Sequence, residues 1–416
     1  MDDMTKLNIS LRMRVLLENF TALSMLQIVN YLLPLLTLPY LVRVLNPEKF
    51  GLIAFAQALT QYLILLTDFG FNFSAVREIS INRDNINKVS EIFSTVYLIK
   101  LLLTLFCFIL LCLILIFPKF NKEWQLHLLM FGTVIGNMLF PVWFFQGLEK
   151  MKYITILNIL YKGIFTLLIF IFIREETDYI LFPIINFFGY LTVGISGLWI
   201  AINRFSVRLF IPTRENVIYQ FKLSYHFFAS RACLAIYTVS NTFLLGIGGN
   251  NEITGFYAAA EKLIRAIESM NQPVINALYP YLSRTKDKRI MKYSVYIGVI
   301  MGVVSCLILS TFGDQIANSF YGPNFEVTAS IIKLYAIDLL IVFPSGLIGL
   351  PVLAAFGYVK YLNYTNLFGL LTYFLLLSGA VFFYGFNIYL LIITIIISET
   401  VVLFTRILGL NKYKLW

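Results

Sequence analysis

Residues 101–117, LLLTLFCFILLCLILIF, decide the fold class of this chain. The stretch holds no charged residue, and the apolar run continues back to residue 92 with a single interruption at Lys100. A helix needs about 20 predominantly apolar residues to cross the hydrocarbon core of a bilayer. The sequence therefore predicts a membrane-spanning helix over residues 92–117.

The whole chain has the same character. Of its 416 residues, 59% are hydrophobic and 13% are charged, and the mean hydropathy is +0.81. Soluble domains average about 45–50% apolar and about 25% charged residues. Because a chain this apolar cannot hide its surface inside a water-soluble globule, the composition excludes a soluble enzyme, a secreted disulfide scaffold and a disordered chain.

Apolar runs bounded by charged residues, or by clusters of Gly, Pro and Asn, recur along the whole sequence. A helix satisfies its own backbone hydrogen bonds within the bilayer, so we expect an all-α integral membrane protein with twelve transmembrane helices. The expected spans are residues 20–43, 51–74, 92–117, 125–147, 153–173, 179–202, 222–248, 253–279, 291–313, 327–351, 359–384 and 386–408.

The distribution of Lys and Arg predicts the orientation. The chain has 32 basic and 22 acidic residues, a net charge of +10. With the N-terminus inside, the inner loops and tails hold 21 of the basic residues and the outer loops hold 5. Basic residues collect in cytoplasmic loops, so we expect a multi-pass protein with both termini in the cytoplasm.

Two internal matches indicate a repeat. Residues 48–59 match 252–263, and residues 141–158 match 351–368, at offsets of 204 and 210. Six spans are an even number of crossings, so the halves share one orientation, a known transporter design. We expect two six-helix lobes related by a parallel pseudo-two-fold repeat around a central cavity. The expected divisions are a cytoplasmic N-terminal segment 1–19, an N-lobe 20–202, a cytoplasmic linker 203–221, a C-lobe 222–410 and a cytoplasmic tail 411–416.

Polar residues in the eighth and second spans fall on one helix face each. At 100° per residue the two stripes have the same register under the offset of 204, as two lobes that line one cavity would require. The alternative is that charges on one helix neutralise each other, through Glu261 with Arg265 and Arg265 with Glu268. The stripes consist of Tyr257, Glu261, Arg265, Glu268 and Gln272 in the eighth span, and Gln57, Gln61, Asp68 and Asn72 in the second.

Ionisable residues inside spans usually face a bundle interior or a water-filled cavity. Lys100, Lys162 and Arg231 have no acidic residue within four positions, so they need partners from other helices or a bound anion. Lys333 is close enough to a span end to reach the headgroups. The remaining ionisable residues within spans are Lys262, Asp338 and Glu399.

The sequence offers no motif for catalysis, a metal or a cofactor. It has no nucleotide-binding or hydrolase signature, and its two histidines, His127 and His226, are far apart. The cysteines at 107, 112, 233 and 306 lie in apolar runs without a CxxC pair, which favours small core residues. We expect a protein that is not an enzyme and that has no cofactor.

Several stretches resemble bacterial polysaccharide transporters, most closely O-antigen flippases of the Wzx type. This family shares a superfamily with lipid II flippases and multidrug extruders, and the resemblance covers nearly the whole chain. The stretches that carry it are Arg43-Val44-Leu45-Asn46-Pro47-Glu48-Lys49-Phe50-Gly51, Asp68-Phe69-Gly70-Phe71, Arg77-Glu78, Trp143-Phe144-Phe145-Gln146-Gly147-Leu148-Glu149, Tyr257-Ala258-Ala259-Ala260-Glu261-Lys262 and Tyr279-Pro280.

The resemblance implies a flippase that moves undecaprenyl-pyrophosphate-linked O-antigen repeat units from the cytoplasmic to the periplasmic leaflet by alternating access. It also implies a polysaccharide polymerase and a chain-length regulator as partners. Within that function we expect Arg231, Arg265, Lys262, Lys100 and Lys162 to face the anionic substrate. Asp68, Glu261 and Glu268 are then counter-charges or a proton or cation coupling site, with Asp338 and Glu399 as weaker candidates.

Two alternatives within and beyond the superfamily stay open. A cation-coupled multidrug exporter binds cations in an acidic cavity, whereas basic residues slightly outnumber acidic ones in these spans, 6 to 5. A membrane-embedded glycan polymerase would be expected to carry a large periplasmic loop, and the outer loops predicted here are short. Lipid II flippases typically carry two further C-terminal helices, so the end of the chain after the twelfth span favours the O-antigen branch.

Overall fold

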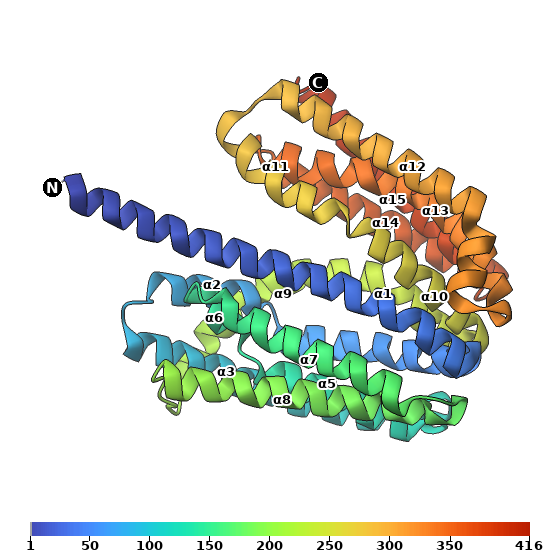
Figure 1. The fold of residues 1–416 in the computed structure, drawn as a ribbon, viewed down its shortest axis with the longest axis horizontal. Coiled ribbons are helices and arrows are strands. Elements are labelled where there is room, and N and C mark those ends of the chain that lie inside the picture. Colours follow the sequence, from blue (N-terminus) through green and yellow to red (C-terminus); the bar gives the residue numbers. More distant parts are fainter. Residues whose placement is uncertain (1) are drawn as a thin grey trace. The chain divides into compact units, whose positions relative to one another are not determined.

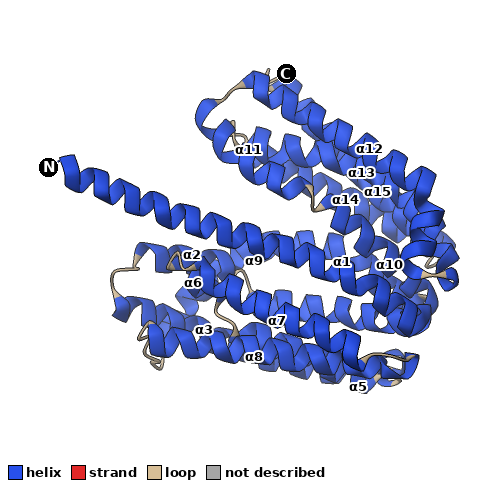
Figure 2. Ribbon diagram, viewed as in Figure 1, coloured by secondary structure: helices blue, strands red, loops and turns tan. Residues whose placement is uncertain are grey.

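The computed structural model describes the backbone of residues 2–416. It describes the side chains of residues 25–27, 29–30, 32–229, 231–232 and 239–416. Cys233 and the predicted N-terminal segment 1–19 lie outside the described side chains. Within the described backbone every regular element is a helix (Figures 1 and 2).

The α-helices of the first part of the chain are α1 (Asp2–Asp68), α2 (Phe71–Ile81), α3 (Ile86–Ile114), α4 (Pro118–Asn121), α5 (Trp124–Leu139), α6 (Val142–Gly147), α7 (Met151–Phe172), α8 (Leu181–Arg204) and α9 (Arg214–Gly248). Those of the second part are α10 (Asn251–Glu268), α11 (Asn271–Thr285), α12 (Lys288–Tyr321), α13 (Glu326–Leu347), α14 (Val359–Tyr384) and α15 (Ile388–Lys412). Short 3-10 turns, η1 (Glu176–Ile180) and η2 (Pro323–Phe325), and a π-helical segment, η3 (Ile348–Ala354), complete the set.

Nine helical stretches of the described residues are long and apolar enough to cross a membrane. One of them, Met25–Ile81, covers two predicted spans and contains a break at Asn46, where φ is 59°. The expected all-α, multi-pass membrane fold is confirmed. The count of twelve crossings and the pseudo-two-fold repeat stay predictions.

Proline interrupts two of the predicted spans. The span expected over residues 253–279 is two helices, α10 and α11, because Pro273 has no N–H to donate to the carbonyl of Ser269 four residues earlier. Pro141 acts in the same way between α5 and α6. Averaged hydropathy does not locate such breaks, because each depends on the position of a single proline.

The chain divides into two compact units. Unit 1 comprises Met1–Thr37 and Ala56–Ile236, and unit 2 comprises Leu38–Phe55 and Tyr237–Trp416. Two helices therefore contribute to both units: α1 gives residues 38–55 to unit 2, and α9 gives residues 214–236 to unit 1. The lobe boundaries expected from the sequence stay a prediction.

In unit 1 the helix pairs α5–α8, α7–α8 and α2–α6 pack closely (Figure 1). An aromatic core fills the space around Phe93, Trp143 and Phe144, which are fully buried. The N-terminal part of α9 packs in this unit through stacked rings. The Phe69 ring centroid lies 4.3 Å from that of Phe221 and 4.6 Å from that of Phe228.

In unit 2, α13 is the central helix and packs against α10, α12 and α15. The 38–55 segment of α1 is held against the start of α10 by a close backbone approach. A Cβ on Gly51 would lie 1.8 Å from the carbonyl oxygen of Asn251, and one on Gly255 would lie 2.0 Å from that of Pro47. Only glycine fits at these two positions, which accounts for the Gly51 and Gly255 match in the sequence repeat.

Candidate functional site

The polar stripe predicted for the eighth span is carried by α10. Asn250 caps the helix, its side chain accepting from the backbone N–H of Glu252 at 3.0 Å. On the opposite face Ala259, Ala260 and Leu263 are buried. The apolar face anchors α10 in unit 2, and Glu261, Arg265 and Glu268 extend from the other face.

Arg265 lies between the two carboxylates of its own helix. Its Nη1 is 2.9 Å from Glu268 Oε2, and its Nη2 is 3.9 Å from Glu261 Oε1. The Arg265 side chain is 35% exposed, against 14% for Glu261 and 11% for Glu268. The pairing foreseen as the alternative interpretation is therefore present, and the guanidinium stays accessible.

Residues of neighbouring helices complete this end of α10. Thr242 donates to Glu261 Oε2 at 2.6 Å. The Asn241 amide donates to the Tyr257 hydroxyl at 3.2 Å and accepts from Tyr373 at 2.6 Å. These contacts connect α9, α10 and α14 within unit 2.

Polar groups of α13 and α15 adjoin this end of α10: Asp338 and Glu399, the weaker candidates from the sequence, and Tyr335, which the sequence prediction did not include. Tyr335 and Asp338 are fully buried, and Asp338 interacts electrostatically with Glu268, Arg265 and Glu399. Among the described residues, no hydrogen-bond partner is present for Asp338 Oδ1, the Tyr335 hydroxyl or Glu268 Oε1. We call Glu261, Arg265, Glu268, Asp338 and Glu399 the acidic cluster.

All five members of the acidic cluster are candidates named from the sequence, but the neutral residues that surround them are not. The three-residue spacing of Tyr335 and Asp338 places both on one face of α13, which is the signal that could have identified Tyr335. Asn241, Thr242 and Tyr373 are neutral residues in apolar helices, and no pattern distinguishes them from ordinary packing residues.

In unit 1 the predicted polar residues of the second span meet α3. Lys100 Nζ lies 2.9 Å from Asp68 Oδ1, and the Asn72 amide donates to Asp68 Oδ2 at 3.4 Å. The Lys100 side chain is only 2% exposed, and that of Asp68 is 19% exposed. The partner from another helix that the sequence required for Lys100 is thus Asp68.

The other predicted cations have neutral partners. Lys162 Nζ donates to Asn30 Oδ1 at 2.5 Å. Arg231 is exposed and lies 5.5 Å from the centroid of the Phe73 ring, and Lys262 lies 4.9 Å from that of Phe50. Of the predicted polar lining, Gln57 is half-buried, while Gln61 and Gln272 are exposed.

Two further basic residues lie near span ends. Lys333, which the sequence places near the end of a span, pairs with Asp314 at 2.5 Å. Arg406 of α15, which was not among the candidate residues from the sequence, donates from Nη1 to the carbonyl and hydroxyl of Ser345 at 2.7 and 2.8 Å, and from Nη2 to Asn366 at 2.8 Å. It connects α13, α14 and α15.

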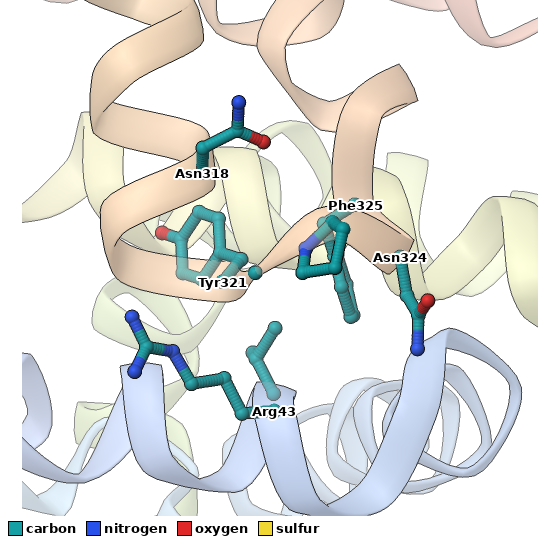
Figure 3. Close-up of a pocket in the computed structure, with 8 residues that line it drawn as sticks. Arg43, Asn318, Tyr321, Asn324 and Phe325 are labelled. Carbon is teal, nitrogen blue, oxygen red and sulfur yellow. The ribbon is translucent and has the colours of Figure 1, made fainter.

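A pocket of about 430 Å³ opens beside the break in α1 (Figure 3). Arg43 crosses one side of it and donates to the carbonyls of Ser319 and Phe320 at the end of α12. Asn318, Asn324 and Phe325 line the rest. Because the Arg43 guanidinium caps a helix C-terminus, where cations are favourable, the arrangement accounts for Arg43 structurally. No cluster suited to a metal ion occurs among the described His, Cys, Asp and Glu residues.

Comparison with known proteins gives the family. Residues 16–286 match the family model described as polysaccharide biosynthesis protein. The chain belongs to this family. It is 29% identical over 350 residues to a protein named "Putative O-antigen transporter" from Escherichia coli (strain K12), covering 82% of this chain and 84% of the relative. A protein of the same name from Shigella dysenteriae is 26% identical over 391 residues, covering 92% and 97%.

Solved structures share the fold at low sequence identity. A lipid II flippase MurJ in the inward closed conformation superposes with a TM-score of 0.71 and 14% identity, covering 95% of this chain and 87% of that chain. An inward-facing multidrug resistance MATE family transporter of the MOP superfamily gives a TM-score of 0.62 and 15% identity, covering 92% and 94%. The family resemblance stated from the sequence is confirmed, and the chain has a transporter fold.

Proposed function

We propose that this protein is a flippase for lipid-linked oligosaccharide, and that it moves undecaprenyl-pyrophosphate-linked O-antigen repeat units from the cytoplasmic to the periplasmic leaflet by alternating access. The observation that carries the proposal is a set of paired acidic and basic side chains within the helices of a polysaccharide biosynthesis family member. The names of the two relatives support the substrate class.

The substrate explains why such charges are present. A pyrophosphate and a polar glycan cannot enter hydrocarbon unaided, because an isolated buried charge is strongly unfavourable. Basic side chains replace water around the phosphates, and charge-assisted hydrogen bonds are the strong ones. The proposed set is Arg265, Arg231, Lys262, Lys162 and Lys100. Arg265 leads it because its side chain is 35% exposed and its guanidinium can present two donors to phosphate.

Lys100 differs from the other cations of the set because it is not accessible in this conformation. Its ammonium is enclosed and held by Asp68, so it can meet an anion only when that pair opens. We assign Lys100 to the set as a cation released in another conformation of the transport cycle. Arg231, which is exposed and lies over the Phe73 ring, needs no such release.

The carboxylates of the acidic cluster take part as exchangeable counter-charges. When pyrophosphate replaces Glu261 and Glu268 at Arg265, the two carboxylates lose their compensating charge in a low-dielectric region. Proton uptake removes that penalty, since desolvation and like charge both favour the neutral carboxyl. Substrate release in the opposite state then restores the Arg265 pairs. Asp68 has the same role beside Lys100.

A cation-coupled multidrug exporter is the second candidate, and one observation favours it. The acidic cluster contains four carboxylates and a single guanidinium, a surplus of negative charge that suits a cationic ligand. Accumulation of cationic dyes on deletion of the gene, with unchanged surface polysaccharide, would establish that function in place of the flippase.

The direct test uses purified protein in proteoliposomes with a fluorescent lipid-linked oligosaccharide in both leaflets. We expect a membrane-impermeant quencher to reach more of the label when the protein is present than in protein-free vesicles. The matched lipid carrying pyrophosphate without sugars, and a neutral glycolipid, serve as specificity controls. Equal accessibility with and without the protein would contradict the proposal.

The proposed orientation has both termini in the cytoplasm. Reporter fusions after residues 214 and 286 should give cytoplasmic signals, and a fusion after Asn250 should give a periplasmic signal. A periplasmic signal after residue 286 would overturn both the number of crossings and the orientation. This outcome is independent of the transport assay.

A further inference from the structure

We infer that one end of unit 2 carries a binding surface for anionic phospholipid headgroups. The surface is formed where the α11–α12 turn, the start of α14 and the end of α15 come together. We call it the basic rim, and it consists of Arg284, Lys286, Lys288, Arg289, Lys292, Lys360, Lys412 and Lys414. All of these side chains are exposed except Lys292, which is half-buried.

The rim cations lie against carbonyls and aromatic rings. Lys288 Nζ donates to the carbonyl of Lys414 at 2.6 Å, and Lys286 donates to that of Ala355. Lys292 lies 5.5 Å from the ring centroid of Trp416. Lys412 lies 5.7 Å from the ring of Tyr361 and 5.6 Å from that of Tyr413. Neutral partners of this kind fix the position of each cation and leave its charge uncompensated.

Among the described residues of this end the one acidic side chain, Asp287, is engaged elsewhere. It caps α12, accepting from the backbone N–H groups of Arg289 and Ile290 at 2.8 and 3.2 Å. A carboxylate at a helix N-terminus interacts with the positive end of the helix dipole. The basic rim therefore has eight basic side chains, and the one nearby carboxylate among the described residues, Asp287, is used as a helix cap.

The rim is built on a packed base. Below it Leu282, Met291, Val352 and Leu415 belong to one buried cluster. Tyr358 and Tyr413 stack at 3.7 Å between centroids and connect α14 to the end of α15. Because these elements pack together, the positive charges are held near one another before any ligand arrives, which lowers the entropy lost on binding.

Unit 1 differs at the corresponding basic loops. There Lys88 pairs with Glu91 at 2.8 Å, and Arg83 lies 3.5 Å from Glu149. Two basic residues of those loops thus have carboxylate partners, whereas Lys152 and Arg204 lie over the Tyr153 ring. No ion pair of the described residues involves a member of the basic rim, which separates the rim from the general excess of positive charge in the chain.

The chemistry favours a lipid phosphate over other anions. Exposed aromatic side chains, Tyr293, Tyr296 and Trp416, accompany the cations, and Tyr and Trp are enriched where protein meets the headgroup region. Clusters of Lys and Arg beside membrane-spanning helices attract anionic lipids, with about 1 kcal/mol, or about fivefold in affinity, for each charge near the surface. We commit to a phosphodiester headgroup such as that of phosphatidylglycerol.

The experiment uses the purified full chain in nanodiscs of phosphatidylcholine with a fixed fraction of brominated lipid. Bromine quenches nearby tryptophan fluorescence, and the Trp416 ring lies beside the basic rim, 5.5 Å from Lys292. We expect brominated phosphatidylglycerol to quench Trp416 more than brominated phosphatidylcholine does, the Trp416 signal being obtained by subtraction of the Trp416→Phe variant. Equal quenching by the two lipids would overturn the inference.

Charge variants decide whether the rim is responsible. Lys288→Gln with Arg289→Gln and Lys292→Gln should lower the preference for phosphatidylglycerol at least about fivefold, the factor of a single surface charge. The matched control, Arg77→Gln with Arg83→Gln and Lys88→Gln, removes three charges from unit 1 and should retain the preference. Equal loss in both would overturn the inference as a net-charge effect.

Two further measurements test whether unfolding or binding of free phosphate explains the result. Melting in pure phosphatidylcholine nanodiscs should be the same for both triple variants, which excludes unfolding as the cause. If millimolar inorganic phosphate abolished the preference, the rim would bind free phosphate and the assignment to a lipid would be wrong. None of these outcomes depends on flipping, so failure here leaves the proposed transport function intact, and the reverse also holds.

Discussion

The two units treat their membrane-embedded charges differently. In unit 1 one lysine and one aspartate, Lys100 and Asp68, form an enclosed pair at 2.9 Å. In unit 2 Arg265, whose side chain is 35% exposed, pairs with Glu261 and Glu268, and Asp338 and Glu399 extend the acidic cluster beyond them. A matched, enclosed pair favours a fixed structure, whereas a surplus of one sign around an accessible cation leaves that cation able to change partners. The comparison predicts that the charges of unit 2 respond to substrate and protons, and that the charge pair of unit 1 mainly stabilises the structure.

The largest expected effect is at Arg265. Arg265→Ala should abolish surface polysaccharide at normal protein levels, because it removes the accessible guanidinium and leaves buried carboxylates without a counter-charge. Arg265→Lys should keep part of the activity, since the charge stays while the planar fork is lost. Polysaccharide on gels, with protein levels by immunoblot, gives the readout.

A triple variant separates binding from neutralisation. Glu261→Gln, Arg265→Gln and Glu268→Gln together remove all three charges at similar size. If Arg265 only neutralised its neighbours, this variant would export normally, and Arg265 would leave the proposed binding set. We expect it to fold and to fail in export.

The next largest effect concerns the enclosed pair of unit 1. Lys100→Met should destabilise the protein by about 3–5 kcal/mol, because breaking a buried pair leaves an uncompensated charge. Adding Asp68→Asn should restore the melting temperature in detergent. Export is then compared among Lys100→Met, Asp68→Asn and the double variant.

The double variant shows what Lys100 does beyond pairing. Recovery of stability together with full export would restrict Lys100 to a structural role and remove it from the cation set. Recovery of stability without export would support release of Lys100 toward the substrate during the cycle. Unchanged stability in Lys100→Met alone would contradict the enclosed pair itself.

The sequence predicted much of the fold because hydropathy and charge are properties of each segment alone. The apolar runs identify the helices, and the 100° periodicity places Glu261, Arg265 and Glu268 on one face of α10. It could not predict Asp68 as the partner of Lys100, since that contact depends on how α1 and α3 pack. It also missed Tyr335 and Asn241, whose importance comes from being buried beside charges, and Arg406, whose position near a span end resembles that of a tail residue.

A smaller effect is expected for the surplus carboxylates of unit 2. Asp338→Asn should leave the melting temperature unchanged or raise it, because it removes one like charge from a buried acidic cluster, and a charged group without partners is unfavourable there. Glu326→Gln, at the start of the same helix, is the matched control for loss of one acid. A melting temperature lowered by several degrees in Asp338→Asn alone would show that the Asp338 carboxylate is ionised and compensated, against the comparison drawn above.

The smallest effect on stability, and the finest test of the comparison, lies at Arg231 in the half of α9 that belongs to unit 1. Its guanidinium is exposed and lies 5.5 Å from the Phe73 ring centroid, an interaction that contributes about 0.5–1 kcal/mol at exposed sites. Arg231→Ala and Phe73→Leu should therefore lower the melting temperature by similar small amounts. Their export should differ, because Phe73→Leu keeps the cation and Arg231→Ala removes it. Loss of polysaccharide in Arg231→Ala alone would keep Arg231 in the proposed cation set and show that unit 1 contributes to recognition of the anion. Normal export in both variants would leave Arg231 as a packing residue and remove it from that set.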